Sequence, residues 1–164
     1  MIRTAILTLS DKGSKGERED ESGSAIREMV SAIGAEVRHY AVLPDEQRLI
    51  SAELSRLADS CEIDLILTTG GTGVAPRDVT PEATREVIDR ELPGMAEAMR
   101  AESLRKTPHA MISRAVAGIR KRTLIVNLPG SPRAVRENLA VVLPALRHAV
   151  EKIQGDPSDC ARPA

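Results

Sequence analysis

Two aspartates, Asp45 and Asp78, are the residues of this chain best suited to hold a metal ion beside a phosphate. Asp45 follows an apolar run over residues 36–43, and Asp78 lies in a charged loop beyond a second apolar run that ends at Thr69. Magnesium is commonly bound by one or two carboxylates together with phosphate oxygens, so the pair predicts a magnesium site. Two other roles stay open: Asp45 can cap the following helix, and Asp78 can pair with Arg77, which can equally face a phosphate.

The stretch between these acids is rich in glycine and threonine. The sequence TTGGTG, over residues 68–73, directly follows the second apolar run. Closely spaced glycines let backbone N–H groups approach phosphate oxygens. The stretch is neither a P-loop, because the Lys-Ser/Thr ending is missing, nor a GxGxxG loop; a tight turn that needs glycine dihedrals is the alternative. The candidate binding residues here are Thr69, Gly70, Gly71, Thr72 and Gly73.

A second loop compatible with phosphate, PGSP, occupies residues 129–132. It follows an apolar run over residues 123–128 and opens a helical pattern, so its N–H groups could hold an anion at a helix N-terminus. Ser131 as an ordinary helix N-cap is the competing interpretation. The candidate residues of this segment are Asn127, Pro129, Gly130 and Ser131.

Strand-like and helix-like segments alternate around these loops. Short apolar runs rich in β-branched residues predict strands over residues 2–9, 36–43, 63–69 and 123–128. Apolar residues at helical spacing predict helices over residues 22–33, about 47–61, about 80–90, 95–105 and 131–153. Thr80 is expected to cap its helix with Pro81 at the first helical position, and Pro144 to kink or split the last helix. Residues 107–118 show no clear pattern.

This alternation predicts a single α/β domain over residues 1–153, followed by a flexible tail over residues 154–164. The expected fold is a mostly parallel sheet with helices on both faces, a Rossmann-like three-layer arrangement. Ligands of such sheets bind at the carboxyl ends of the strands. The segments expected at that edge are Ser10–Asp11, Pro44–Asp45, Thr68–Gly73 and Asn127–Ser131. Because every strand delivers a polar loop there, we expect one site built from all of them.

The composition excludes several classes of protein. The chain has 164 residues, 41% of them hydrophobic, and a net charge of -1, which suits a soluble domain without the basic field of a nucleic-acid binder. One tyrosine, with no phenylalanine or tryptophan, predicts an aliphatic core and rules out stacking platforms for single-stranded nucleic acid. The distant Cys61 and Cys160 favour a reducing compartment. With no apolar run of membrane length and no signal peptide, we expect a cytoplasmic protein.

None of the three histidines has a neighbour that would make it a catalytic base, and no Ser-His-Asp or Cys-His arrangement is visible. Such a chain suits phosphoryl-type transfer, which depends on positioning and charge stabilisation more than on a covalent nucleophile.

The whole pattern resembles the MogA/MoaB family of molybdenum-cofactor biosynthesis proteins, which includes the related G domain of plant and animal fusion proteins. The resemblance runs from Leu9-Ser10-Asp11 to the last helix and rests on several motifs together. These are PDE over residues 44–46, TTGGTG followed by PRDVTPEAT over 76–84, ELPGM over 91–95, AGIR over 117–120 and NLPGSP over 127–132.

The resemblance implies a molybdopterin adenylyltransferase, which transfers AMP from magnesium-ATP to molybdopterin and releases pyrophosphate. In the family, acids matching Asp45 and Asp78 are the catalytically important pair, and the TTGGTG and NLPG loops shape the nucleotide and pterin pockets. The resemblance places Ser113 and Arg114 on the pterin side, and it implies a homotrimer and a molybdenum insertase as partner. This chain departs from the family at residues 121–122, a Lys-Arg pair where relatives can carry a small residue such as serine near the pterin pocket. The change either adds a phosphate contact or falls at an exposed position.

Three alternatives stay open on the sequence alone. The first is a paralogue that binds molybdopterin without adenylylating it, although retention of Asp45 and Asp78 favours the enzyme. The second is a Rossmann-type oxidoreductase, poorly supported because the first strand leads to Ser10-Asp11 rather than GxGxxG. The third is a subunit that docks onto an insertase, with the apolar face of residues 95–104 as an oligomer interface.

Overall fold

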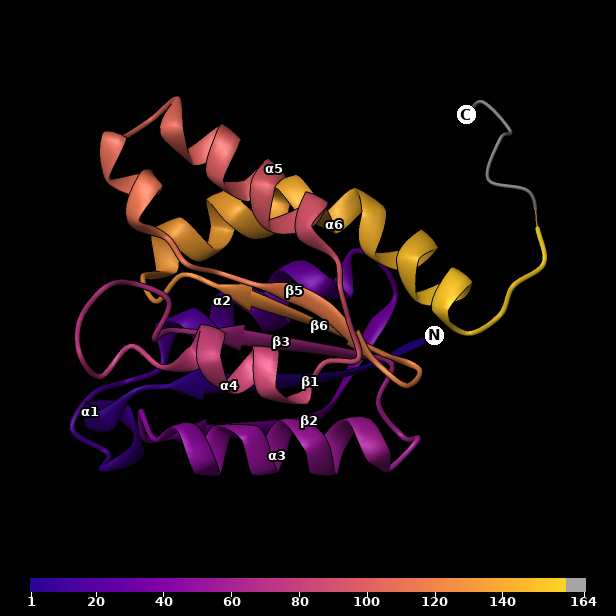
Figure 1. Cartoon of the computed structure of the whole chain (residues 1–164), viewed down its shortest axis with the longest axis horizontal. Coiled ribbons are helices and arrows are strands. Elements are labelled where there is room, and N and C mark those ends of the chain that lie inside the picture. Colours follow the sequence, from indigo (N-terminus) through magenta and orange to yellow (C-terminus); the bar gives the residue numbers. More distant parts are fainter. Residues whose placement is uncertain (159–164) are drawn as a thin grey trace.

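The computed structural model describes residues 1–158 and shows one six-stranded sheet between two layers of helices (Figure 1). The strands follow the order β2-β1-β3-β6-β5-β4 across the sheet. Strands β2, β1, β3 and β6 run parallel, while β5 and β4 add antiparallel pairs at one edge. Their bounds are β1 (Ile2–Leu9), β2 (Ala35–Leu43), β3 (Leu65–Thr69), β4 (Arg90–Glu91), β5 (Ala117–Arg120) and β6 (Thr123–Leu128). The predicted fold, a mostly parallel α/β sheet, is confirmed.

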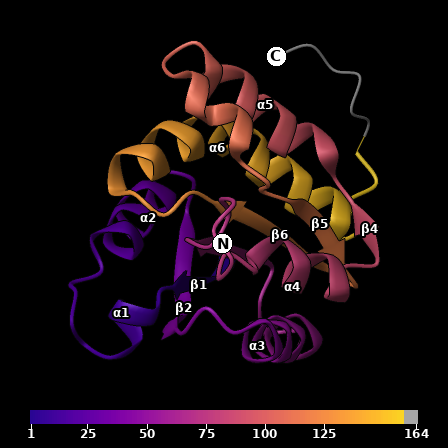
Figure 2. The ribbon, with the colours of Figure 1, turned by 60° about the vertical axis from the view of Figure 1, so that its left-hand side comes forward.

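Helices cover both faces of the sheet, as Figures 1 and 2 show. Helices α2, α5 and α6 pack on one face, and α3 and α4 pack on the other. Their bounds are α1 (Asp11–Ser14), α2 (Glu21–Ser31), α3 (Gln47–Asp59), α4 (Thr80–Val87), α5 (Pro93–Leu104) and α6 (Pro132–Ile153), with a short 3-10 helix at Pro108–Ile112. No helix within residues 1–158 is long and apolar enough to span a bilayer.

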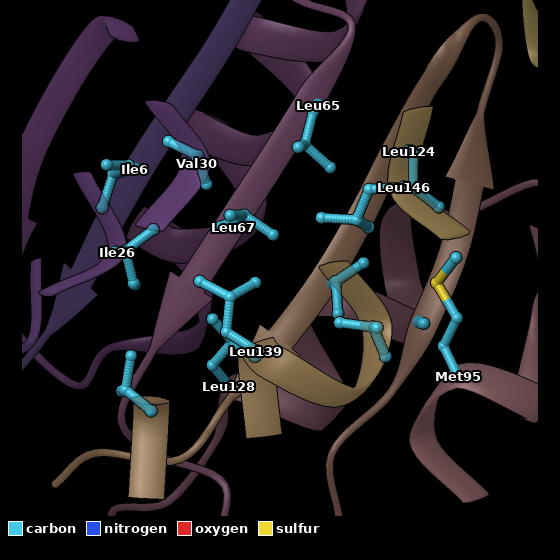
Figure 3. Close-up of a cluster of buried hydrophobic side chains, with 14 of the residues drawn as sticks. Ile6, Ile26, Val30, Leu65, Leu67, Met95, Leu124, Leu128, Leu139 and Leu146 are labelled. Atoms are coloured by element: carbon cyan, nitrogen blue, oxygen red, sulfur yellow. The ribbon is translucent and has the colours of Figure 1, made fainter. Parts of the chain in front are cut away.

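The core is aliphatic, as the composition predicted. Leu65 and Leu67 of β3 pack among Ile26 of α2 and Leu139 of α6 (Figure 3), whereas Ile66 belongs to the core under α3 and α4. Successive side chains of a strand point to opposite faces, so a strand covered on both faces must be apolar throughout. That requirement explains the unbroken apolar run that identified β3 in the sequence.

Three predicted element bounds are wrong. Helix α4 ends at Val87, because residues 90 and 91 form the edge strand β4 against β5. The helix predicted over residues 95–105 begins two residues earlier, because α5 starts at Pro93, a residue suited to the first helical turn. Pro144 does not split α6, which continues from Pro132 to Ile153. A helix-interior proline costs about 3 kcal/mol, and α6 buries apolar side chains on both sides of it, from Val135 to Val150.

The segment that gave no pattern, residues 107–118, contains the 3-10 helix and the first two residues of β5. At the other end of the chain, Gln154 follows α6 and accepts a hydrogen bond from Arg122 Nε at 2.9 Å. Cys160 and the part of the expected tail beyond Ser158 lie outside the described residues.

Candidate functional site

The polar segments that follow the parallel strands form one hollow at the edge of the sheet, with a volume of about 310 Å3. Ser10 follows β1, Asp45 follows β2, residues 70–71 follow β3, and residues 130–131 follow β6; all of them line the hollow. In Figure 1 the loop after β3 and helix α1 lie together at the left-hand end of the molecule, away from the N-terminus. The sequence predicted this convergence, because carboxyl ends of parallel strands share an edge.

Gly70 and Gly71 turn the chain sharply out of β3. Both have positive φ angles, +99° and +64°, a region that other residues seldom adopt. A Cβ at Gly70 would lie 2.3 Å from the carbonyl oxygen of Leu9, and one at Gly130 would lie 3.3 Å from the Cα of Gly70. The glycines therefore serve both the tight turn and the close approach of β1 and the loop after β6.

The loop after β3 presents a row of unused backbone donors. Thr80 holds the carbonyl oxygens of residues 70 and 71, at 2.9 Å from its Oγ1 and 3.2 Å from its N. Arg114 holds those of residues 72 and 73, at 2.9 Å from its N and 2.6 Å from its Nε. A trans peptide directs its N–H opposite its carbonyl, so the N–H groups of residues 71–74 point away from these two residues. Within residues 1–158 none of these N–H groups has an acceptor, which leaves the row open to an anion.

Threonine side chains join the loops of the site to one another. Thr80 is not the helix cap predicted from the sequence: Val79 occupies that position, and Thr80 Oγ1 is committed to the loop after β3. Thr69 Oγ1 donates to the carbonyl oxygen of Pro129 at 2.7 Å and so ties β3 to the loop after β6. Ser131 caps α6, as the competing interpretation held, by accepting from Ala134 N at 3.2 Å.

Asp45 is bound to Asp11 rather than to a helix. The Asp11 N–H donates to Asp45 Oδ2 and the Asp45 N–H donates to Asp11 Oδ1, each at 3.0 Å. The helix-cap alternative for Asp45 is wrong, because Glu46 holds the cap position of α3 and makes no side-chain cap bond there. Asp11 also receives two hydrogen bonds from the guanidinium of Arg77, at 2.6 and 2.8 Å. Asp11 therefore joins the ends of β1 and β2 to the loop that carries Asp78.

Arg77 does not pair with Asp78, the alternative that sequence left open. Asp78 Oδ2 instead accepts from the N–H of Ala75 at 2.9 Å, within its own loop. A Cβ at Gly73 would lie 2.8 Å from the same oxygen, so this carboxylate lies directly beside Gly73.

Asp45 and Asp11, which are joined by these reciprocal hydrogen bonds, differ in electrostatic environment. Burial raises the pKa of Asp45, and the charges of Asp11 and Asp78 raise it further. The hydrogen bond from the Asp11 N–H and the charge of Arg77 act in the opposite direction but do not cancel the rise. The guanidinium of Arg77, followed by the backbone N–H of Asp45, lowers the pKa of Asp11. Negative charge thus accumulates at Asp45, which is the condition that a divalent cation relieves.

Asp45 and Asp78 both line the hollow and fit a magnesium ion only in part. Within residues 1–158, no group of three His, Cys, Asp or Glu side chains is placed to hold a metal. Magnesium usually keeps several waters and binds through one or two carboxylates plus substrate phosphates. The donor set therefore fits a metal that arrives with a polyphosphate.

A second hollow, of about 430 Å3, adjoins the first. Gly71, Asp78 and residues 130–131 belong to the walls of both. Ser113 and Pro129, expected on the substrate side, line the second hollow, and so do Thr72 and Gly73.

Sequence reasoning missed several lining residues. Arg18, Asp20 and Ser22 line the first hollow, and Arg100 and Asn138 line the second. A signal existed for the first group, because the charged stretch after the first strand had to start from the same edge. The second group comes from α5 and α6, whose approach to the site depends on tertiary packing.

Asn127 lies at the predicted edge but lines neither hollow. Its side chain is completely buried, with its amide donating to Thr68 Oγ1 at 3.0 Å and Thr84 Oγ1 at 2.9 Å. Its Oδ1 accepts from Val116 N at 3.1 Å, so this side chain holds β6 to its surroundings.

Lys121 and Arg122 lie at the opposite end of the sheet, in the turn between β5 and β6. Lys121 Nζ lies 2.9 Å from Asp59 Oδ1, and both residues are exposed. The expectation that this pair stands near a pterin pocket is therefore wrong, and the alternative of an exposed position is confirmed.

Fold and site together define a member of a known class. Residues 5–148 match the family described as "probable molybdopterin binding domain". The chain belongs to this family of molybdopterin-binding domains.

Several of the proteins to which it is similar are named molybdopterin adenylyltransferases. The chain is 46% identical over 157 residues to the molybdopterin adenylyltransferase of Helicobacter pylori strain J99, covering 94% of this chain and 89% of that protein. It is 44% identical over 140 residues to the molybdopterin adenylyltransferase of Escherichia coli K12, covering 84% and 72%. The crystal structure of the molybdopterin biosynthesis enzyme MoaB from Thermus thermophilus superposes with a TM-score of 0.90 at 56% identity, covering 97% of this chain and 100% of that one. The MogA/MoaB resemblance is confirmed.

Proposed function

We propose that this chain is a molybdopterin adenylyltransferase, which transfers AMP from magnesium-ATP to molybdopterin and releases pyrophosphate. The observation that carries the proposal is the pair of adjoining hollows with Asp78 and residues 130–131 in both walls. A transfer between two phosphate-bearing substrates requires that their phosphates be held in contact, and a shared wall is where such groups would meet. The names of the relatives support the enzyme and give no support to a paralogue that only binds molybdopterin.

The reaction joins a phosphate oxygen of molybdopterin to the α-phosphorus of ATP. The bond from that phosphorus to the bridging oxygen breaks, and pyrophosphate leaves with the electron pair. This step needs no covalent nucleophile from the protein, because positioning and charge stabilisation suffice. The open N–H groups of residues 71–74 would bind phosphate oxygens and stabilise the charge that develops on the transferred group.

Asp45 and Asp78 are the residues that would hold magnesium. Asp11 fixes Asp45 through reciprocal hydrogen bonds of 3.0 Å, which keeps its carboxylate at the end of β2. When bound, the ion supplies positive charge opposite the reacting phosphates.

The test is formation of adenylylated molybdopterin from ATP, magnesium and molybdopterin, comparing wild type with Asp45→Asn and Asp78→Asn. Asparagine keeps the size of aspartate but removes the charge that a magnesium ion requires, so we expect turnover to fall by about 100-fold or more in each. Asp59→Asn is the matched control, because this exposed acid pairs with Arg120 at the far end of the sheet and should leave turnover unchanged.

Each contrary result has a definite meaning. Wild-type protein that binds molybdopterin yet forms no product would replace this proposal by the pterin-binding paralogue. Normal turnover in either asparagine variant would refute the metal-holding role of that acid.

We further propose a cytoplasmic homotrimer that passes its product to a molybdenum insertase. The family resemblance supports the trimer, and the shallow hollow between α5 and α6 offers apolar surface at Ala98, Ala101, Ala140 and Val141. Sedimentation equilibrium tests the assembly, and a monomeric mass at micromolar concentration would contradict it.

A further inference from the structure

Arg114, which the family resemblance places on the pterin side, makes several hydrogen bonds to the loop after β3. Its backbone N donates to the carbonyl oxygen of Thr72 at 2.9 Å. In its side chain, Nε donates to the carbonyl oxygen of Gly73 and Nη2 to that of Asp78, both at 2.6 Å. Its remaining nitrogen, Nη1, pairs with Glu82 at the start of α4. Every nitrogen of this arginine therefore bonds to the protein itself, and the side chain lines neither of the two adjoining hollows.

The contacts bridge the two ends of a loop whose middle is tied to the domain by the hydrogen bonds from Arg77 to Asp11. Residues 74–77 are exposed, and inside the loop Ala75 exchanges hydrogen bonds of 2.9 Å with Asp78, through its N–H to Oδ2 and its carbonyl to the Asp78 N–H. The guanidinium of Arg114 spans the carbonyl that opens this loop, at Gly73, and the one that closes it, at Asp78. A planar fork of N–H donors suits this geometry, because it reaches two acceptors in fixed relative directions.

Both functional features of the loop depend on these carbonyls. Holding the carbonyls of Thr72 and Gly73 directs the N–H groups of residues 73 and 74 to the opposite side, where they are open. Holding the carbonyl of Asp78 fixes the backbone from which its carboxylate projects into both hollows.

We propose that Arg114 is a positioning residue for adenylyl transfer: it clasps the loop over residues 73–78 and thereby places the Asp78 carboxylate at the wall shared by the two hollows and orients the open N–H groups of residues 73 and 74. The inference rests on the proposed function for its catalytic consequence, but the clasp itself is a property of the fold. Arg114 acts through the loop and not by contact with either substrate.

The perturbation is Arg114→Lys, which keeps the charge and pairing with Glu82 but cannot reach both carbonyls at once. Arg120→Lys is a matched control at the far end of the sheet, because Arg120 also pairs with an acid, Asp59, and donates to a carbonyl, Val87 O at 2.8 Å. Glu82→Gln is a second variant, which removes the negative charge that pairs with the guanidinium of Arg114. It should lower turnover and loosen the loop as Arg114→Lys does, but by a smaller factor.

Three measurements separate positioning from general stability. Turnover at saturating substrates should fall about 10- to 100-fold in Arg114→Lys, as expected when a reacting group is misplaced by about an ångström, and should be unchanged in Arg120→Lys. Amide hydrogen exchange of a peptide over residues 70–79 should rise in Arg114→Lys, rise less in Glu82→Gln, and stay unchanged in Arg120→Lys. In an Asp78→Asn background the Arg114→Lys substitution should lower the remaining turnover by a smaller factor than it does in wild type, since the part of its effect that acts through Asp78 is already lost.

Wild-type turnover together with unchanged exchange in Arg114→Lys would overturn the proposal. A full additional loss of turnover in the Asp78→Asn background would also overturn it, because Arg114 would then act independently of Asp78. If wild type itself forms no adenylylated product, the proposed function fails, and exchange of the loop alone decides whether Arg114 clasps it.

Discussion

Replacement of Gly70 by alanine tests whether the turn out of β3 is as constrained as the structure indicates. The residue is buried, has a φ of +99°, and lies between the carbonyl oxygen of Leu9 and the loop at Gly130. A Cβ there would stand 2.3 Å from the Leu9 oxygen, closer than real Cβ contacts allow. Leu9 ends a buried strand, so relief of the overlap must move backbone and not a flexible side chain.

The expected loss of stability has two parts. An L-residue in left-handed backbone costs about 1–2 kcal/mol, and the forced displacement of packed backbone adds about 1–3 kcal/mol. Together these give a loss of about 2–5 kcal/mol in the free energy of unfolding, a large part of the roughly 5–15 kcal/mol of a typical domain. For a chain of this length each kcal/mol lowers the melting temperature by about 2–4 °C, so we expect a drop of about 4–20 °C.

Urea unfolding of Gly70→Ala and Gly16→Ala measures the two parts separately. Gly16 also has a positive φ, +73°, but a Cβ there meets nothing within 4 Å, so only the backbone term applies to it. The difference between the two variants should be about 1–3 kcal/mol, the displacement of packed backbone. Equal losses in the two variants would refute the claim that the Leu9 carbonyl excludes a side chain at Gly70.

Two further predictions concern titrating groups. Burial, then the hydrogen bond and charge of Asp20, raise the pKa of Tyr40 to about 12. Ultraviolet titration follows this residue alone, because the chain has one tyrosine and no tryptophan. Asp20→Asn should shift the titration midpoint toward the ordinary tyrosine value, and an unmoved midpoint would contradict the role assigned to Asp20. Burial raises the pKa of Asp64 but the hydrogen bonds from Arg3 outweigh it and lower the pKa overall, so Asp64 stabilises the fold above its unfolded pKa of about 4 and loses this effect as pH falls through the folded value. The difference in free energy of unfolding between wild type and Asp64→Asn should therefore shrink below about pH 4, and a difference that grows in acid would show the sign to be wrong.

The amino-acid sequence by itself determined the parallel part of the sheet and the edge that carries the site. The inner parallel strands β1, β3 and β6 are largely apolar on both faces. Every parallel strand, including the edge strand β2, is closed by glycine, proline, aspartate or serine, so short-range pattern and turn chemistry suffice to recognise them. Chain order then brings Ser10, Asp45, Gly70 and Gly130 to one edge. The acids Asp45 and Asp78 could be singled out for the same reason, since their chemistry and their place in loops are both local properties.

Only the tertiary structure decided which partner each polar group has. Asp45 could have capped α3 but is bound to Asp11, and Arg77 could have paired with its neighbour Asp78 but reaches Asp11 instead. Asn127 belongs to a motif at the edge that carries the site, yet its side chain is completely buried and lines neither hollow. In each case several partners satisfy the local pattern equally, and the choice depends on strands that are distant in the chain.

The clearest limit of local pattern is the segment that contains Arg114. It has no helical or strand periodicity, because a 3-10 helix and a four-residue strand are too short to establish one. Its position is set by pairing of β5 with β6 and by hydrogen bonds to residues 72–78, more than 30 positions earlier in the chain. Contacts of that range leave no periodic trace in the sequence. The family resemblance could point to Arg114, but its hydrogen bonds to the loop after β3 became visible only in the folded chain.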